Sequence, residues 1–187
     1  MGRWEPGADD RLREAALALY LEHGFDQTMV ADIADRAGVT ARTFFRYFAD
    51  KREVLFDKAG EMAEKSLAAL EAAPATASTL AVVAAALDAA ADLVGRDRER
   101  ARQRHAVIMA NADLRERELI KLAHMSAALA DGLRRRGVDD TEAVLAAEAG
   151  AAVYRVAFER WAADDDLDLR DAIRQSFEQL RTLTAAG

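Results

Sequence analysis

The sequence has no cysteine, only two prolines, and few aromatic residues, which make up 6% of its 187 positions. Without cysteine the chain has no disulfide framework, no thiolate metal site and no cysteine nucleophile. Alanine, leucine, glutamate and arginine dominate instead, and this composition favours helix over strand nearly everywhere. We therefore expect an all-α protein of about nine helices, in a reducing compartment.

Long apolar runs are also missing. The longest, residues 80–94, is shorter than a membrane span and contains Asp88 and Asp92. The first ten residues are polar and lack the apolar segment of a secretory signal. We expect a cytoplasmic protein with no membrane partner. Its net charge of -7 argues against indiscriminate binding of nucleic acid, although a local basic face is still allowed.

The usual signatures of catalysis and of metal binding are absent as well. The three histidines, His23, His105 and His124, are too far apart in the sequence for a local metal motif. There is no glycine-rich phosphate loop, and no nucleophile lies beside an identifiable base. The sequence therefore predicts no catalytic residue, no metal ligand and no cofactor, so we expect a protein that is not an enzyme.

What the N-terminal part does contain is a series of signals for short helices. A helix from about residue 9 to 22 should end at Gly24, because glycine accepts the left-handed conformation of a helix end. Thr28 is the expected N-cap of a second helix, and Thr40 that of a third over residues 41–48. Two short helices joined by a tight turn predict a helix-turn-helix.

The rest of the chain reads as longer helices. We expect a fourth helix from residues 50–51 to about 72, before a break at Pro74. Five more should follow, at about residues 78–94, 97–111, 114–136, 140–163 and 168–183, the eighth starting in a capping box of Asp139 and Glu142. The predicted domains are a three-helix head over residues 1–50 and a larger helical domain over residues 51–187.

The third expected helix carries an unusual density of rings and arginines. At about 100° per residue, Phe44 and Phe48 share one side, and Arg42 and Arg46 point away from it. Residues 36–52 contain five basic residues and one acidic residue, in a chain that is acidic as a whole. The outward surface then carries two guanidinium groups, a hydroxyl and two rings, with a lysine just beyond the helix: Arg42, Thr43, Phe45, Arg46, Tyr47 and Lys51.

This surface suits the major groove of duplex DNA. Arginine can bond guanine in a bidentate manner, threonine can meet a base edge or a thymine methyl group, and lysine and tyrosine can hold phosphates. The alternative is that the arginines are simply solvated and the rings pack against neighbouring helices. An exposed ring normally needs a partner, which favours the docking face.

Residues 11–56, and above all TMVADIADRAGVTARTFFRYFADKREVLF, resemble the N-terminal domain of the tetracycline-repressor (TetR) family of transcription regulators. The resemblance implies a homodimer that inserts two third helices into a double-stranded DNA operator. At Phe45 the family often has tyrosine, so a hydroxyl that could reach a phosphate is missing here. The implied base contacts are Ala41, Arg42 and Thr43, the implied phosphate contacts are Thr28, Phe45, Tyr47 and Lys51, and Thr40 and Arg46 complete the set.

The C-terminal part resembles that of mycofactocin-type regulators, in RHAVIMANADLRERELIKLAHMSAALADGLRRRGVD and in VYRVAFERW. This resemblance suggests a small-molecule effector, either an acyl thioester or another elongated apolar compound. For each candidate pocket residue, a place in the ordinary core is the alternative. The candidates are Met62, His105, Met109, Met125, Tyr154, Phe158 and Trp161.

The eighth and ninth helices are the expected dimer interface. Small residues on the eighth allow close helix approach, and the ninth has an apolar stripe, so the pair and its symmetry mate would form a four-helix interface. The alternative is a core within one chain. The predicted interface residues are Ala147, Gly150, Ala151, Ile173, Phe177 and Leu180.

Together these features predict a ligand-responsive DNA-binding regulator, most simply a repressor that an apolar or amphipathic effector releases from a palindromic operator. The competing hypothesis is an all-α ligand-binding or protein-interaction module whose helix-turn-helix contacts another protein rather than DNA.

Overall fold

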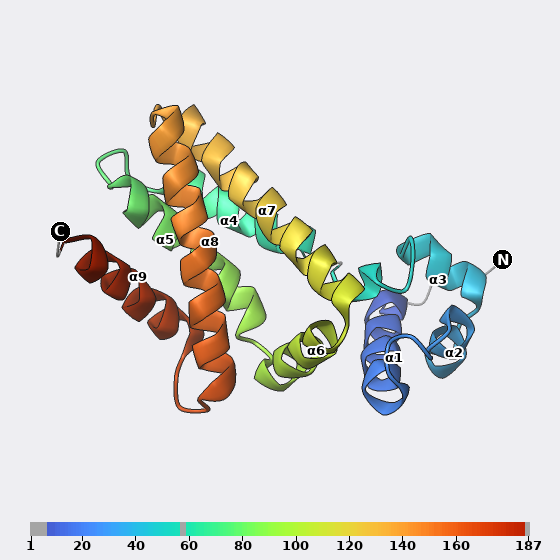
Figure 1. Cartoon of the computed structure of the whole chain (residues 1–187). Coiled ribbons are helices and arrows are strands. Elements are labelled where there is room, and N and C mark those ends of the chain that lie inside the picture. Colours follow the sequence, from blue (N-terminus) through green and yellow to red (C-terminus); the bar gives the residue numbers. More distant parts are fainter. Residues whose placement is uncertain (1–6, 57–58, 186–187) are drawn as a thin grey trace. The chain divides into compact units, whose positions relative to one another are not determined.

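The structure, a computed structural model, describes residues 7–56 and 59–185. Within these residues all regular secondary structure is helical, so the expected all-α fold is confirmed. Figure 1 shows the helices in chain order: α1 (Ala8–His23), α2 (Val30–Arg36), α3 (Ala41–Tyr47), the short 3-10 helix η1 (Glu53–Leu55), α4 (Ala59–Ala72), α5 (Thr79–Val94), α6 (Arg98–Ala110), α7 (Ala112–Arg135), α8 (Asp140–Ala163) and α9 (Leu169–Ala185).

The chain divides into two compact units. Unit 1 comprises residues 1–58 together with residues 102–118, and unit 2 comprises residues 59–101 and 119–187. The helices α6 and α7 therefore each contribute residues to both units.

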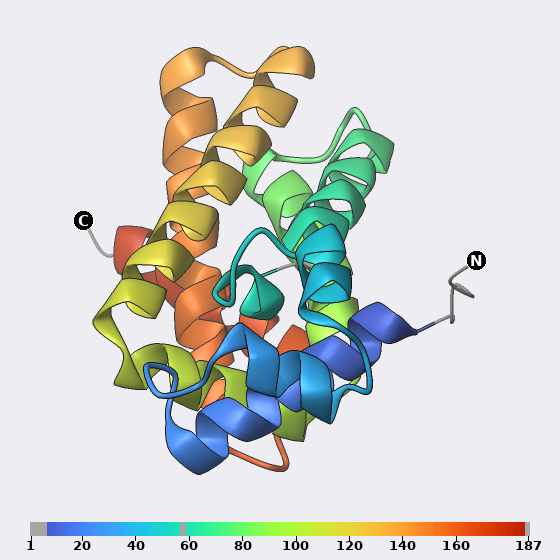
Figure 2. The ribbon, with the colours of Figure 1, turned by 90° about the vertical axis from the view of Figure 1, so that its right-hand side faces the viewer.

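Unit 1 is built on a core that joins α1, α2 and α3, which Figure 2 brings to the front. Leu12, Ile33 and Phe44, one from each helix, are completely buried. Ile108 and Leu114, on either side of the corner between α6 and α7, belong to the same apolar cluster. The three N-terminal helices are thus packed against one another and against this corner.

Two arginines attach the segment around η1 to the corner between α6 and α7. The Arg104 guanidinium donates to the Leu55 carbonyl at 2.7 Å and forms a bidentate pair with Glu118. Arg117 is paired with Glu53. These partly buried pairs have fixed geometry, so they hold the chain that follows α3 in one position.

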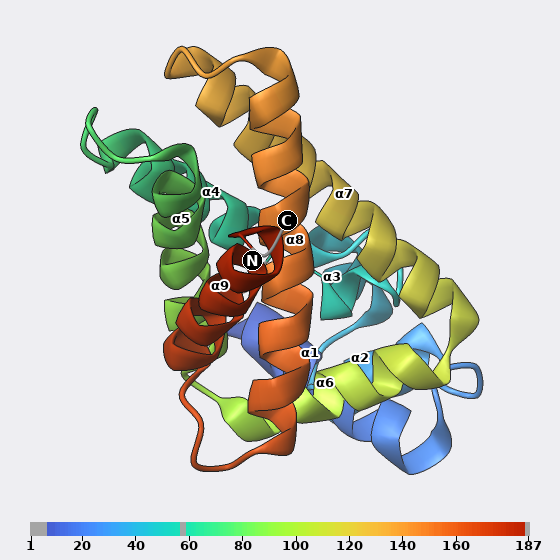
Figure 3. The same ribbon diagram turned by 60° about the vertical axis from the view of Figure 1, so that its left-hand side comes forward.

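Unit 2 is a helical bundle in which α5 packs against α4, α8 and α9, and α9 also packs along α8 (Figure 3). Its largest completely buried side chains include Leu70, Leu129, Ile173 and Trp161. At Gly150 of α8 the helix axes approach closely, since an added Cβ atom would lie 2.5 Å from Val83 Cγ1 of α5. Glycine at this position is what permits the contact between α5 and α8.

Most helix boundaries fall within two residues of those expected, but the fourth helix begins later than predicted. At residues 50–56 the chain forms a turn and the short η1 instead. The Asp50 carboxylate accepts hydrogen bonds from the backbone N–H groups of Arg52 and Glu53, which is the bonding of an N-cap, but the helical segment that follows ends at Leu55. Residues 57 and 58, which the expected fourth helix includes, lie outside the described part of the chain.

The expected cap of α8 is also different. The Asp139 side chain makes no capping hydrogen bond. Glu142, the other half of the expected capping box, accepts a hydrogen bond from the Thr79 hydroxyl at the start of α5. The Glu142 carboxylate therefore links α5 to α8 instead of capping α8.

Candidate nucleic-acid interface and effector cavity

The helix α3 separates its apolar and polar side chains as the sequence predicts. Thr40 caps it, since its Oγ1 accepts a hydrogen bond from the Thr43 backbone N–H at 3.2 Å. Phe44 and Phe48 are buried in the core of unit 1, at 0% and 3% exposure. On the other side Arg42 is exposed and Phe45 is 57% exposed.

The exposed face of α3 also keeps its positive charge. Two other basic residues of this region are neutralised, because Arg36 forms a bidentate pair with Glu22 and Arg52 pairs with Asp50. These hydrogen bonds lower the pKa of both carboxyl groups, so the pairs stay ionised at neutral pH. Within the described residues, Arg42 has no carboxylate partner.

Arg46 has an aromatic rather than an acidic neighbour. Its guanidinium lies 4.9 Å from the centre of the Tyr47 ring and donates to the Tyr47 hydroxyl at 3.2 Å. This contact orients the side chain without removing its charge. Arg42, Thr43, Phe45 and Arg46 together line an open depression on the surface of unit 1, which we call the α3 face. Ala41, also exposed, lies beside it at the start of the helix.

Lys51, a predicted phosphate contact, has a different set of partners. Its ammonium group donates to the carbonyls of Phe25, Thr28 and Asp26, at 2.8, 3.0 and 3.3 Å. It also lies 4.4 Å from the centre of the Phe25 ring. An ammonium group has three donors, so these bonds use all of them. Lys51 holds the loop between α1 and α2 and has no donor left for a phosphate.

The Lys51 backbone is held by Tyr20 of α1. The Tyr20 hydroxyl donates to the Lys51 carbonyl at 2.6 Å, and burial raises the pKa of this phenol well above its ordinary value. The proton therefore stays on the tyrosine oxygen and the bond persists over the physiological pH range.

Thr28 is likewise engaged within the chain. It is 2% exposed, and its hydroxyl donates to the Gly24 carbonyl at 2.9 Å. The N-cap of α2 is Met29, one residue later, whose N–H donates to the Asp32 carboxylate. Thr28 is therefore neither the N-cap nor an exposed hydroxyl that could reach a phosphate.

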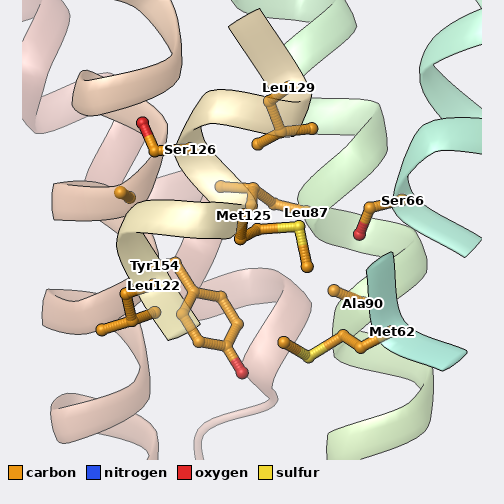
Figure 4. A pocket seen from close by; sticks show the side chains of 10 residues that line it. Met62, Ser66, Leu87, Ala90, Leu122, Met125, Ser126, Leu129 and Tyr154 are labelled. Carbon is orange, nitrogen blue, oxygen red and sulfur yellow. The ribbon is translucent and has the colours of Figure 1, made fainter. Parts of the chain in front are cut away.

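A second candidate site is a small cavity inside unit 2, which we call the effector cavity. The cavity itself has a volume of about 20 Å³. All the space around it that no atom fills, including the part open to solvent, amounts to about 370 Å³. Its walls come from α4, α5, α7 and α8, and Figure 4 shows most of them. They are Met62, Ser66, Leu87, Ala90, Leu122, Met125, Ser126, Leu129, Ala151 and Tyr154.

Three of the seven predicted pocket residues line this cavity: Met62, Met125 and Tyr154. Phe158 and Trp161 belong to the core of unit 2, where Arg98 lies over the Trp161 ring at 4.9 Å. Their rings are packed against other core side chains instead of lining the cavity.

His105 and Met109 are on the part of α6 that belongs to unit 1, so they do not share a unit with the cavity. Sequence reasoning missed Ser66, Leu87 and Leu129, which look like ordinary inward positions of their helices. Only the tertiary packing of four helices brings them together.

The predicted dimer residues are mostly used within the chain itself. Ala147 and Gly150 are buried against the rest of unit 2, as are Ile173 and Phe177, which are 1% and 3% exposed. Ala151 lines the effector cavity, and Leu180 is packed at the edge of the core. The small residues of α8 therefore admit α5 of the same chain, which was the alternative reading of these two helices.

A different side of α8 is exposed and apolar. Leu145 is 65% exposed and Val156 is 42% exposed. With Ala149 and Ala152 between them they follow helical spacing along one side of the helix. We call these four residues the α8 stripe.

The described residues contain neither a membrane-spanning helix nor a cluster of metal-ligating side chains. No helix in residues 7–56 or 59–185 is both long enough and apolar enough to cross a membrane. In the same residues, no three histidine or acidic side chains are grouped as a metal site would require.

Comparison with known proteins places both parts of the chain. Residues 12–57 match the family model of bacterial regulatory proteins of the tetR family. Residues 77–185, more than half of the chain, match the model of the MftR C-terminal domain. The two matches correspond to the two resemblances that the sequence predicts.

Two relatives agree with this assignment. The HTH-type transcriptional regulator TcmR of Streptomyces glaucescens is 40% identical over 90 residues, which are 48% of this chain but only 38% of TcmR. MftR of Mycobacterium tuberculosis, named for the regulation of mycofactocin biosynthesis, is 24% identical over 181 residues, which are 95% of this chain and 91% of MftR.

A solved structure shares the fold. The transcriptional regulator FadR from Bacillus subtilis, in complex with stearoyl-CoA, superimposes with a TM-score of 0.62 at 21% identity, over 91% of this chain and 96% of FadR. The family models, the relatives and the helix-turn-helix of α2 and α3 lead to one conclusion: this chain belongs to the TetR family of bacterial regulatory proteins, carries an MftR-type C-terminal domain, and is a transcriptional regulator.

Proposed function

We propose that the chain is a ligand-responsive repressor that binds a palindromic DNA operator as a homodimer. A small apolar or amphipathic effector, bound in unit 2, would release it. Residues 1–50 would form the DNA-binding domain, and residues 51–187 the domain that binds the effector and dimerises. The arrangement of the α3 face carries the DNA-binding part of this proposal.

The α3 face has the chemistry of a groove-reading surface. Arg42 projects from the first turn of α3, from which side chains reach base edges when such a helix enters the major groove. Arg46 keeps its charge beside the Tyr47 ring and can reach a phosphate or a guanine. Phe45 is exposed without a hydroxyl, so its ring would make apolar contact with a sugar or a thymine methyl group.

The phosphate contacts implied for Thr28 and Lys51 need a different donor. Both side chains are engaged by backbone carbonyls. Tyr47, Arg46 and the Thr40 hydroxyl remain at the edge of the α3 face. We infer that phosphates are held there, and that Lys51 contributes by fixing the loop that precedes α2.

The effector cavity supports an apolar or amphipathic ligand. Its walls are hydrocarbon and thioether apart from the hydroxyls of Ser66, Ser126 and Tyr154. FadR, which shares the fold, is solved with stearoyl-CoA. An acyl thioester is therefore one class of effector to test, together with compact apolar compounds that need less room.

The direct test begins with selection of an operator by the full chain from a random duplex library. Affinity for the selected sequence should then fall steeply with salt, because basic side chains displace counterions from phosphates. Candidate effectors should raise the melting temperature and lower operator affinity together. Failure to enrich any duplex, with a salt-independent background, would instead favour a module that contacts another protein.

A further inference from the structure

Three serines are buried in unit 2, and they differ in their hydrogen bonds. Ser176 donates to the Ala172 carbonyl at 2.8 Å, the usual partner of a serine inside a helix. Ser126 donates to the Glu148 carboxylate at 2.6 Å. Ser66, which is 1% exposed, has no hydrogen-bond partner within the described residues.

An unpaired buried hydroxyl is costly and needs an explanation. Ser66 lies on α4 and borders the effector cavity, and Figure 4 shows its oxygen directed toward the space between Met62 and Met125. Ser126 turns its own hydroxyl toward Glu148, away from this space. Ser66 therefore presents an open hydrogen-bonding position to the cavity.

Water is a poor occupant of this position. A buried water molecule normally makes about three hydrogen bonds, and the cavity of about 20 Å³ has room for little more than one. Besides Ser66, the walls near this position are the thioethers of Met62 and Met125 and the hydrocarbon of Leu87 and Ala90. A ligand with its own apolar body and one polar group satisfies Ser66 without leaving other polar atoms unpaired.

The walls also indicate the shape of that ligand. Met62 from α4 and Met125 from α7 extend into the cavity from two sides, and the Tyr154 ring closes a third (Figure 4). Methionine side chains adopt many rotamers and make favourable sulfur contacts with aromatic rings. Rearrangement of these two side chains would widen the cavity of about 20 Å³ beside the Tyr154 ring, and such a space suits a compact molecule.

We propose that Ser66 is the polar anchor of the effector cavity, and that the ligand is a compact, mostly apolar molecule with one hydroxyl or carbonyl group. This inference rests on the proposed function for its regulatory meaning, although ligand binding can be measured without DNA. The walls contain no arginine, lysine or histidine. The phosphates of a coenzyme A thioester would therefore find no cation there.

Calorimetric titration of the full chain with 2-naphthol and with naphthalene tests the anchor, since the two probes differ by one hydroxyl. The wild-type chain should bind 2-naphthol about tenfold more tightly than naphthalene. In Ser66→Ala this preference should disappear, because naphthalene affinity stays and 2-naphthol affinity falls. Ser126→Ala, the matched control on the same cavity, should keep the preference because its hydroxyl is bonded to Glu148.

The ligand-free protein gives an independent readout. Ser66→Ala removes an unpaired buried hydroxyl, so the melting temperature without ligand should rise by about 2–4 °C. Ser126→Ala should not raise it. A stabilised Ser66→Ala variant that has lost its preference for 2-naphthol supports the anchor and shows that the variant is folded.

Two results would overturn the anchor. In one, Ser66→Ala binds 2-naphthol as tightly as the wild type. In the other, neither 2-naphthol nor naphthalene binds the wild type, but stearoyl-CoA binds it and releases the operator. That second result would leave the proposed function intact. Conversely, Ser66-dependent binding of 2-naphthol with unchanged operator affinity at saturation supports the anchor and contradicts effector control through this cavity.

Discussion

At the scale of single residues, Lys51 is the clearest difference between expectation and structure. The sequence places it just after the aromatic and basic helix, where a phosphate contact is a natural prediction. In the structure its three donors close the loop between α1 and α2, and Tyr20 fixes its backbone. In the structure the residue therefore fixes the shape of unit 1.

Lys51→Met therefore tests a structural role. It keeps the length of the side chain but leaves two partly buried carbonyls, of Phe25 and Thr28, without their donor, so the free energy of unfolding should fall by about 1–3 kcal/mol. Chemical denaturation measures this directly. Lys65→Met is the control, because the Lys65 pair with Glu61 is on an exposed helix surface and is worth little. Equal stability of the two variants would return Lys51 to the set of phosphate contacts.

The residues that were placed correctly from the sequence are those whose direction is set by helical geometry. On α3, the 100° period alone puts Phe44 inward and Arg42 outward, and the structure agrees. Thr28 and Lys51 lie in loops, where no periodicity fixes the direction of a side chain. Their partners are carbonyls of other segments, which no pattern of residue types in the sequence reveals.

At the scale of helices, Gly150 decides how closely α5 and α8 pack. It was predicted to admit a helix of a second chain, but the space beside it is filled by Val83 of the same chain. A period of small residues indicates that some helix approaches closely. It does not indicate which helix does so, since an intramolecular and an intermolecular neighbour need the same small side chains.

Gly150→Ala should lower the free energy of unfolding by about 1–3 kcal/mol, because the new Cβ atom would overlap the Val83 side chain. Shortening the neighbour as well, in Gly150→Ala with Val83→Ala, should recover part of this loss. The matched control is Gly60→Ala in the first turn of α4, where a Cβ atom meets nothing within 4 Å, so this variant should not be destabilised. Thermal unfolding of these three variants and the wild type distinguishes overlap from a general intolerance of alanine.

Helix positions were predictable where charged residues or glycine at the helix ends coincide with the helical spacing of apolar residues. The expected bounds of α8, 140–163, are those observed. The start of α4 was predicted too early, because the Asp50 carboxylate caps only the short η1, which ends at Leu55. The same cap signal can precede a short or a long helix, and residue type alone does not decide which one forms.

At the scale of the whole molecule, the proposed dimer needs an apolar surface that the chain itself leaves open. Ile173 and Phe177 cannot supply it, because they are buried in the core of unit 2. The α8 stripe, with Leu145 and Val156 as its large members, is open and apolar along one side of the helix. We therefore propose that this stripe, together with the exposed side of α9, contacts the second copy.

Replacing both Leu145 and Val156 with glutamate should produce folded monomers, because each is exposed in the single chain and the charges would be buried only on association. Sedimentation velocity gives the oligomeric state, and circular dichroism gives the fold. Leu21→Glu is the control, because Leu21 is also exposed but lies on α1, outside the α8 stripe. This variant should leave the oligomeric state unchanged. A dimer that persists in the double variant would place the interface elsewhere. Charged residues at Ile173 and Phe177, which are buried in the core, should unfold the chain rather than produce a folded monomer.

The cavity could be predicted only in part. Methionines and aromatic residues in the C-terminal helices were reasonable candidates, and three of seven line it. His105 and Met109 were included because their helix was expected to belong wholly to the larger domain, whereas α6 is divided between the two units. The unpaired hydroxyl of Ser66 is a property of packing, since a serine inside a helix ordinarily bonds its own backbone.

If the α3 face reads DNA, as we propose, Arg42→Ala should weaken binding to the operator. Fluorescence anisotropy would compare this variant with the wild type on the selected operator and on a scrambled duplex, at several salt concentrations. Arg96→Ala, which removes the same charge from an exposed turn after α5, is the control.

We expect Arg42→Ala to lose about 1–3 kcal/mol of binding free energy on the operator, with relaxed choice of base at one position in each half-site. Binding to the scrambled duplex should change much less, and Arg96→Ala should bind both duplexes as the wild type does. If Arg42→Ala binds the operator as tightly as the wild type, or loses equal affinity for both duplexes, then Arg42 does not read a base. Either result would contradict the proposal that the α3 face reads DNA through this residue.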